Sequence, residues 1–219
     1  MRQAVVSSQW PIKSMFATIY LSNFYLQAAM RHQPGLCEKP VALIEEQEKK
    51  PVIIQLNDVA EEAGICKGMT PSQALARSLQ VVIKVRARMQ EKSIQQILLH
   101  YAFTLSPFVE ATAPGICTVQ FTSWHRHPLA RRSLSAKEAA DNQLSRHGER
   151  TGSQCHDNVL RVIEQLAECE IWAQAGIAPT PDTSFLAAHL ARSVLEIENA
   201  KEFLAPLPIE VLETVSPDF

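Results

Sequence analysis

The chain alternates between short apolar runs that resemble strands and longer segments with the periodicity of helices. Residues 15–21 are apolar and rich in strand-forming side chains, whereas residues 90–106 and 159–167 repeat apolar residues at helical spacing. The pattern predicts strands at 15–21, 40–44, 51–56, 81–85, 108–111, 116–121, 171–178 and 202–207, and helices at 24–31, 57–63, 70–76, 90–106, 159–167 and 182–195. Strands and helices that alternate with hairpins interspersed are typical of an α+β fold.

Residues 123–155 differ from the rest of the chain. They are rich in His, Arg and Ser and contain few large apolar residues. Such a composition cannot offset the entropy lost on ordering, so it predicts a mobile insertion, with one helix near 136–144.

Composition and charge narrow the classes of protein. The 219 residues are 46% hydrophobic and carry a net charge of −2, which fits a soluble globular protein and gives no broad field to attract phosphates. No run approaches the ~20 apolar residues of a membrane span, and the N-terminus lacks a signal peptide. We therefore expect a cytoplasmic protein without a membrane partner. Five cysteines without paired spacing predict buried, reduced thiols and no metal site.

Two features have more than one interpretation. Lys84, Arg86 and Arg88 alternate after a predicted strand, so they either contact a DNA backbone or form a solvated face, and we favour the solvated face. Trp172 is either an anchor for a partner protein or a core residue. Its apolar neighbours Ile171 and Ala173 favour the core.

Five segments together carry a family resemblance. They are 19–25 (IYLSNFY), 37–43 (CEKPVAL), 63–74 (AGICKGMTPSQA), the strand pair 105–109 and 119–122, and 174–178 followed by 203–209 (FLAPLPI). In this order and spacing they resemble the Y-family DNA polymerases of the UmuC/DinB type, and 203–209 is similar to the ImuB-like members. The resemblance covers about residues 15 to 210.

The resemblance implies a fold and its boundaries. It implies a palm, with a mixed sheet and helices on one face, and a small fingers subdomain. Residues 1–13 would be an N-terminal tail, 14–22 and 85–206 the palm, 24–84 the fingers, and 207–219 the start of a thumb. The family's little finger would be absent from this chain.

The resemblance also implies where metal chemistry would take place. The family holds two metal ions with acidic side chains, because hard divalent cations require charged oxygen ligands. The corresponding positions are Tyr20 and Ser22 on the first strand, and Gly115 and Ile116 at the start of a later one. None of these four residues is a carboxylate.

The family positions that bind the triphosphate are changed as well. They fall on Asp58 and Glu61, whose negative charges would repel a polyanion. A lysine of the family palm falls on Phe185. Tyr25 matches the family aromatic that screens the sugar, although core packing explains its presence equally.

From these positions we expect a protein that is not an enzyme, binds no cofactor or metal, and acts as an adaptor in DNA repair and damage-induced mutagenesis. The resemblance implies three partners: a sliding clamp, a RecA-like protein and an error-prone replicative-type polymerase. DNA binding by this chain would be weak. Two alternatives stay open. One is an active, divergent translesion polymerase that recruits other carboxylates, such as Asp58 and Glu110. The other is a truncated fragment without a function of its own.

Overall fold

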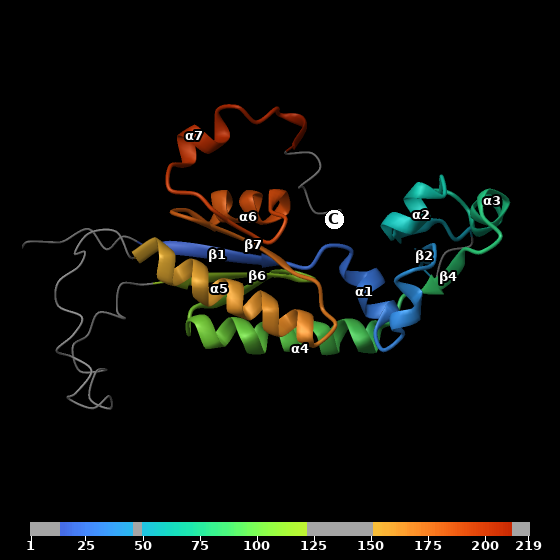
Figure 1. Cartoon of the computed structure of the whole chain (residues 1–219), viewed down its shortest axis with the longest axis horizontal. Helices are drawn as coiled ribbons and strands as arrows, with labels where there is room; N and C mark the ends of the chain where they lie inside the picture. The colour runs from blue at the N-terminus through green and yellow to red at the C-terminus, as the bar shows by residue number, and fades with distance from the viewer. Residues whose placement is uncertain (1–13, 46–49, 122–150, 212–219) are drawn as a thin grey trace, which may run out of the picture.

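The computed structural model describes residues 14–45, 50–121 and 151–211. These residues form two lobes, each built on its own sheet (Figure 1). The larger lobe has a five-stranded sheet and the smaller lobe a three-stranded one.

The larger sheet is centred on β1 (Met15–Tyr20). Its order is β5 (Val109–Ala113), β6 (Ile116–Phe121), β1, β7 (Gln174–Ala178) and β8 (Val194–Glu196). β1 runs antiparallel to both β6 and β7, whereas β8 is parallel to β7, so the sheet is mixed as predicted. The apolar run of β1 explains its central place, because Ala17 and Ile19 are fully buried.

Helices cover both faces of this sheet (Figure 1). α4 (Arg88–Leu105) and α5 (Thr151–Glu168) lie on one face and contribute Ile94, Leu98 and Leu166 to its core. α6 (Pro181–Leu190) packs on the other face, so the expectation of helices on one face alone needs correction. Gly176 allows α6 to pack closely on the sheet, because a Cβ at this position would overlap the α6 backbone at Ser184.

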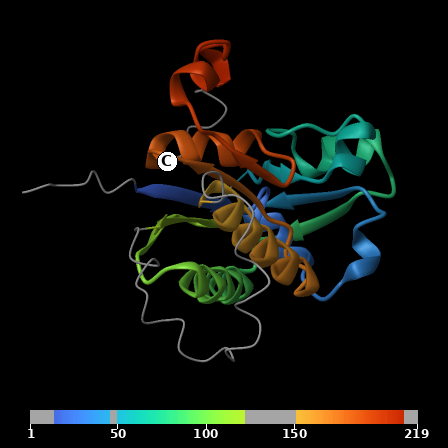
Figure 2. The ribbon, with the colours of Figure 1, turned by 60° about the vertical axis from the view of Figure 1, so that its left-hand side comes forward.

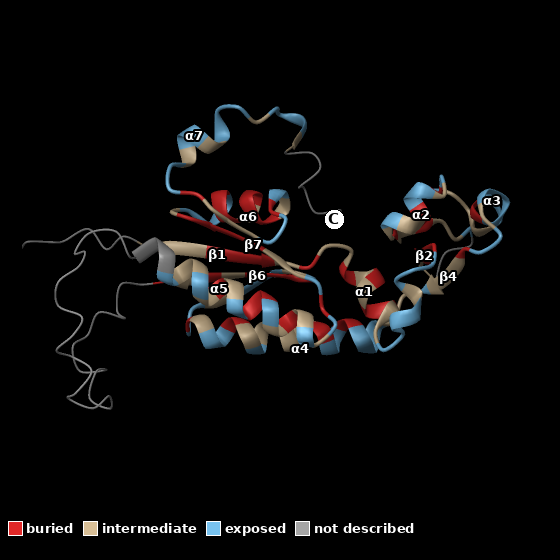
Figure 3. Ribbon diagram, viewed as in Figure 1, coloured by how far each residue is buried: buried red, intermediate tan, exposed pale blue. Residues whose placement is uncertain are grey.

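The smaller lobe has the strand order β3 (Ile53–Leu56), β2 (Val41–Ile44) and β4 (Val82–Val85). β2 is antiparallel to β3 and parallel to β4. Two short helices, α2 (Asp58–Glu62) and α3 (Pro71–Arg77), bury their inner sides and expose their outer sides (Figure 3). α3 begins with a capping box, in which Thr70 and Gln73 exchange hydrogen bonds.

α1 (Phe24–Met30) connects the lobes. Phe24 and Ala28 belong to the core of the larger lobe, whereas Leu26 and Ala29 pack against the smaller sheet. A short 3-10 turn at Pro34–Leu36 then leads to β2, and Figure 2 shows this turn and the two sheets from another side. The two cores therefore meet within one helix, and the boundaries proposed for palm and fingers stay a prediction.

Three expected elements differ from the structure. Residues 202–207 were predicted as a strand, but α7 (Ala200–Leu204) occupies this stretch, because the Asn199 side chain caps it by accepting the Lys201 N–H at 3.1 Å. The helix predicted for 182–195 ends at Leu190, since residues 194–196 pair with β7. The insertion predicted at 123–155 lies outside the described residues up to position 150, and α5 already begins at Thr151.

Two further expectations concern the burial of the cysteines and the lack of a membrane span. All five cysteines are free, but only Cys117 is buried, while Cys37 and Cys66 are exposed. Within the described ranges, no helix is long and apolar enough to cross a membrane.

Candidate functional site

The register of the larger sheet brings the predicted metal positions together. Tyr20, the last residue of β1, pairs with Ile116 on one side and with Gln174 on the other. The Leu21 N–H donates to the Gly115 carbonyl at 2.9 Å. Tyr20, Ser22, Gly115 and Ile116 therefore lie at one end of the sheet, although their side chains differ from the acids of the family.

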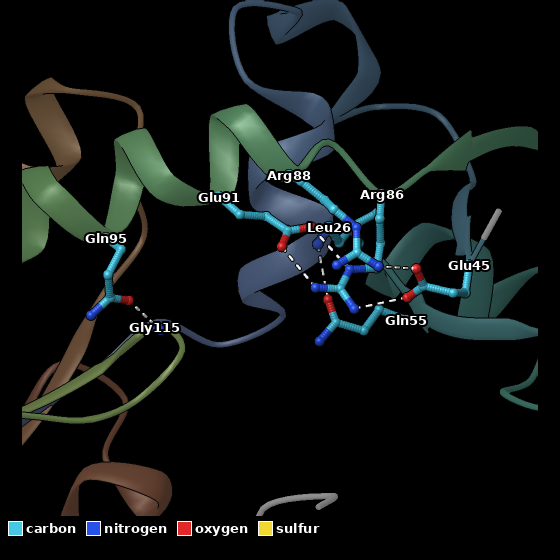
Figure 4. A network of polar contacts seen from close by, with 8 residues as sticks. All are labelled: Leu26, Glu45, Gln55, Arg86, Arg88, Glu91, Gln95 and Gly115. Carbon is cyan, nitrogen blue, oxygen red and sulfur yellow. Dashed lines mark hydrogen bonds and ion pairs between the residues drawn. The ribbon is translucent and has the colours of Figure 1, made fainter. Parts of the chain in front are cut away.

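Gly115 is held in a conformation that suits glycine. Its φ is +76°, and a Cβ would lie 2.7 Å from the Phe24 side chain. Its N–H donates to the Gln95 side chain at 2.7 Å (Figure 4). An aspartate at this position would meet both a strained backbone and the Phe24 ring, so the packing explains why a glycine stands here.

Tyr20 is part of an aromatic stack with α6. Its ring lies 4.0 Å from that of His189, at an interplanar angle of 24°, and the His189 ring lies 4.5 Å from Phe185. Burial raises the pKa of Tyr20 and lowers the pKa of His189. The His189 Nδ1 lies 2.9 Å from the Phe185 carbonyl, which fits a neutral ring that donates from Nδ1.

Sequence reasoning did not single out His189. Phe185 and His189 stand four residues apart on a predicted helix, and that spacing was the available signal. The stack fills the place where the resemblance puts the first acid and the palm lysine.

Tyr25 is covered by an arginine. The Cζ atom of Arg86 lies 3.9 Å from the centre of the Tyr25 ring, a cation–π contact. Arg86 makes two hydrogen bonds to Glu91, from Nε to Oε1 at 2.9 Å and from Nη2 to Oε2 at 2.7 Å, and one from Nη1 to Glu45 at 2.8 Å (Figure 4). Arg88 donates to the second oxygen of Glu45 at 2.8 Å.

This network joins the two lobes. Arg86 and Glu45 follow strands of the smaller lobe, and Glu91 lies in the first turn of α4 in the larger one. The hydrogen bonds that Arg86 donates to Glu91 raise the pKa of Arg86 despite its burial, so this guanidinium stays charged. For Arg86 we expected either a place on a solvated face or a contact with DNA. In the structure its guanidinium forms ion pairs within the protein instead.

Asp58 and Glu61 lie exposed on α2 of the smaller lobe. Both are in the first turn of a helix that Asn57 caps by accepting the Ala60 N–H at 3.1 Å. Acidic side chains stabilise the positive end of the helix dipole, so local helix stability accounts for both residues.

The residues at the predicted metal positions do not fit a pair of divalent cations. Mg²⁺ requires hard, charged oxygen ligands, which Tyr20, Ser22, Gly115 and Ile116 do not provide at neutral pH. Within the described residues, no three His, Cys, Asp or Glu side chains lie close enough to hold a metal ion.

Comparisons with known proteins identify the fold. Residues 19–189 match the impB/mucB/samB family. DinB from Sulfolobus solfataricus aligns at 12% identity with a TM-score of 0.67, covering 90% of this chain and 52% of that one. An insertion ternary complex of Dbh DNA polymerase aligns at 12% identity with a TM-score of 0.68, covering 90% and 53%. The chain thus spans about half the length of these structures. No curated protein matches the sequence.

These matches correct one expectation and support another. The expectation that the chain is not an enzyme is wrong, because the solved structures that it matches include an active complex of Dbh DNA polymerase. Four substituted positions do not establish a loss of activity. The α+β palm-and-fingers fold is confirmed at this coverage.

Proposed function

We propose, from the premise that this chain belongs to the impB/mucB/samB family, that it acts in DNA repair and translesion synthesis as an adaptor for other repair proteins. A polymerase-family role in the response to DNA damage is common to this fold family. The adaptor role is the more specific part of this proposal, and it concerns the binding of partner proteins rather than nucleotide chemistry.

Within the family we assign the chain to the ImuB-like branch. The segment 203–209 supports this assignment, as does the aromatic stack of Tyr20 on His189. The partners we propose are a sliding clamp, a RecA-like protein and an error-prone replicative-type polymerase. The proposed compartment is the cytoplasm, where these proteins meet DNA.

The observation that carries the adaptor role is a set of exposed aromatic side chains on the larger lobe. Phe103, Phe108 and Trp172 are 56%, 54% and 60% exposed. Exposed aromatic rings, tryptophan above all, are often the anchors of protein–protein interfaces. Their positions at the end of α4, before β5 and before β7 offer more than one contact region.

The function is tested genetically. We expect deletion of the coding sequence to lower both the mutation frequency and the survival after ultraviolet damage, and the wild-type sequence to restore them. Primer extension by the purified chain is measured separately, so the two activities are not confused. A deletion strain with unchanged damage-induced mutagenesis and survival would contradict the proposed function.

A further inference from the structure

We propose that Trp172 anchors a protein-docking surface beside the junction of the two lobes, and that its partner presents cationic side chains around an apolar group. This inference rests on the adaptor role proposed above and names a surface and a partner chemistry for it. The surface consists of Trp172, Glu170 and the exposed acidic residues at the end of α5.

The backbone of Trp172 is fixed while its side chain is exposed. The Gln27 Oε1 accepts the Trp172 N–H at 2.8 Å, and the Gln27 Nε2 donates to the Trp172 carbonyl at 2.8 Å. The same Nε2 donates to the Ser22 carbonyl at 2.6 Å. One amide side chain thus joins Trp172 to the segment that follows β1. The backbone of Trp172 is therefore already ordered before a partner covers the ring, which lowers the entropy lost on binding.

The turn after α5 directs Trp172 outward. Glu170 has a left-handed φ of 59°, its N–H donates to Ala167, and the Ile171 N–H donates to Leu166 at 3.0 Å. This is the hydrogen-bonding pattern of a helix C-terminus in which the following apolar residue is buried. Ile171 is fully buried and Trp172 is 60% exposed. The exposure of the Trp172 side chain is therefore a consequence of this ordered backbone turn. The sequence-based placement of Trp172 in the core is therefore wrong.

The exposed stripe of α5 is acidic. Asp157, Arg161, Glu164 and Glu168 are exposed at helical spacing, opposite the buried face of the helix. This row of exposed side chains therefore contains three carboxylates and one guanidinium. Glu170 forms an ion pair with His32 at 3.9 Å. The Glu170 side chain is 52% exposed and the His32 side chain 74%.

Helix stability alone disfavours this arrangement. Glu164 and Glu168 are like charges four residues apart, near the C-terminus where the helix dipole is already negative, and the last turn contains no basic residue. A cationic partner would offset both the repulsion between the two glutamates and their unfavourable interaction with the helix dipole. DNA would not, because its phosphates would meet the same negative potential. We therefore commit to a cationic protein segment as the occupant.

The test measures fluorescence anisotropy of three labelled probes at low salt: a short helical Lys/Leu peptide, its Glu/Leu counterpart and a single-stranded oligonucleotide. We expect the Lys/Leu peptide to bind and the other two not to bind. Trp172→Ala should weaken the binding at least about tenfold, as expected of an interface anchor. The double variant Glu164→Gln/Glu168→Gln should weaken it and flatten its salt dependence.

Leu79→Ala is the control, because Leu79 is an exposed apolar side chain of the smaller lobe, between α3 and β4, and belongs neither to this surface nor to the exposed aromatic set. Binding by this variant should equal that of the wild type, with circular dichroism confirming the fold of each variant. The proposal is overturned if the Lys/Leu peptide does not bind, if Trp172→Ala binds it as tightly as the wild type, or if the oligonucleotide binds through Trp172. In each case an intact response to ultraviolet damage in cells would leave the adaptor function standing.

Discussion

Gly115 shows how a single residue constrains the candidate site. We predict that Gly115→Ala lowers the free energy of unfolding by about 2–4 kcal/mol, because the new Cβ adds backbone strain at φ +76° and a clash with Phe24. Denaturant unfolding measures this change. Gly35→Ala is the control, since no atom lies within 4 Å of a Cβ there, and it should change stability by less than about 0.5 kcal/mol. A Gly115→Ala variant as stable as the wild type would contradict the Phe24 contact.

Arg86 shows at the same scale how one charge holds two lobes together. We predict that Arg86→Met costs about 3 kcal/mol of stability, because it leaves Glu91 unpaired with a side chain only 11% exposed. Arg88→Met should cost less than about 1 kcal/mol, since Arg88 is 59% exposed and makes one contact with Glu45. Equal losses for the two variants, measured by urea unfolding, would show that Arg86 has no special role.

At the scale of elements, sequence patterns predicted the larger helices and strands better than the short ones. The apolar period of 90–106 and 159–167 marks α4 and α5, because each helix buries one stripe against the sheet. β8 has only three residues and depends on pairing with β7, which no local pattern reveals. In α7, Phe203 and Leu204 were predicted as part of a strand, but the cap at Asn199 favours a helix.

The packing of α6 on β1 carries a pH dependence. Burial lowers the pKa of His189 below its ordinary value of 6.5, so the unfolded chain takes up a proton first as the pH falls. This histidine therefore destabilises the fold progressively below that ordinary value. We predict that the melting temperature of the wild type falls more between about pH 7.5 and about pH 5.5 than that of His189→Phe, which keeps the stack on Tyr20.

His100→Phe is the control for this experiment, because His100 lies exposed on α4. Its pH profile should follow the wild type. If His189→Phe has the same pH profile as the wild type, the neutral stacked histidine is not what couples α6 to pH.

At the scale of the whole molecule, two lobes with the fold of DinB and Dbh are retained at 12% sequence identity. The resemblance in sequence named four positions for metal binding, which the pairing of β1 with β6 brings to one end of the sheet. It could not show the Phe24 contact, the stack on His189 or the exposure of Trp172. The Phe24 contact and the stack on His189 join side chains that are distant in sequence and meet only in the folded larger lobe, and the exposure of Trp172 depends on the turn after α5.

The measurement that tests the adaptor role most directly is binding of the purified chain to purified partners. We would immobilise the chain and titrate the source organism's sliding clamp, RecA-like protein and error-prone polymerase by interferometry. We predict that at least one binds with a Kd of about 1 μM or tighter, equivalent to roughly 8 kcal/mol. If none of the three binds a chain that circular dichroism shows to be folded, the adaptor account is contradicted.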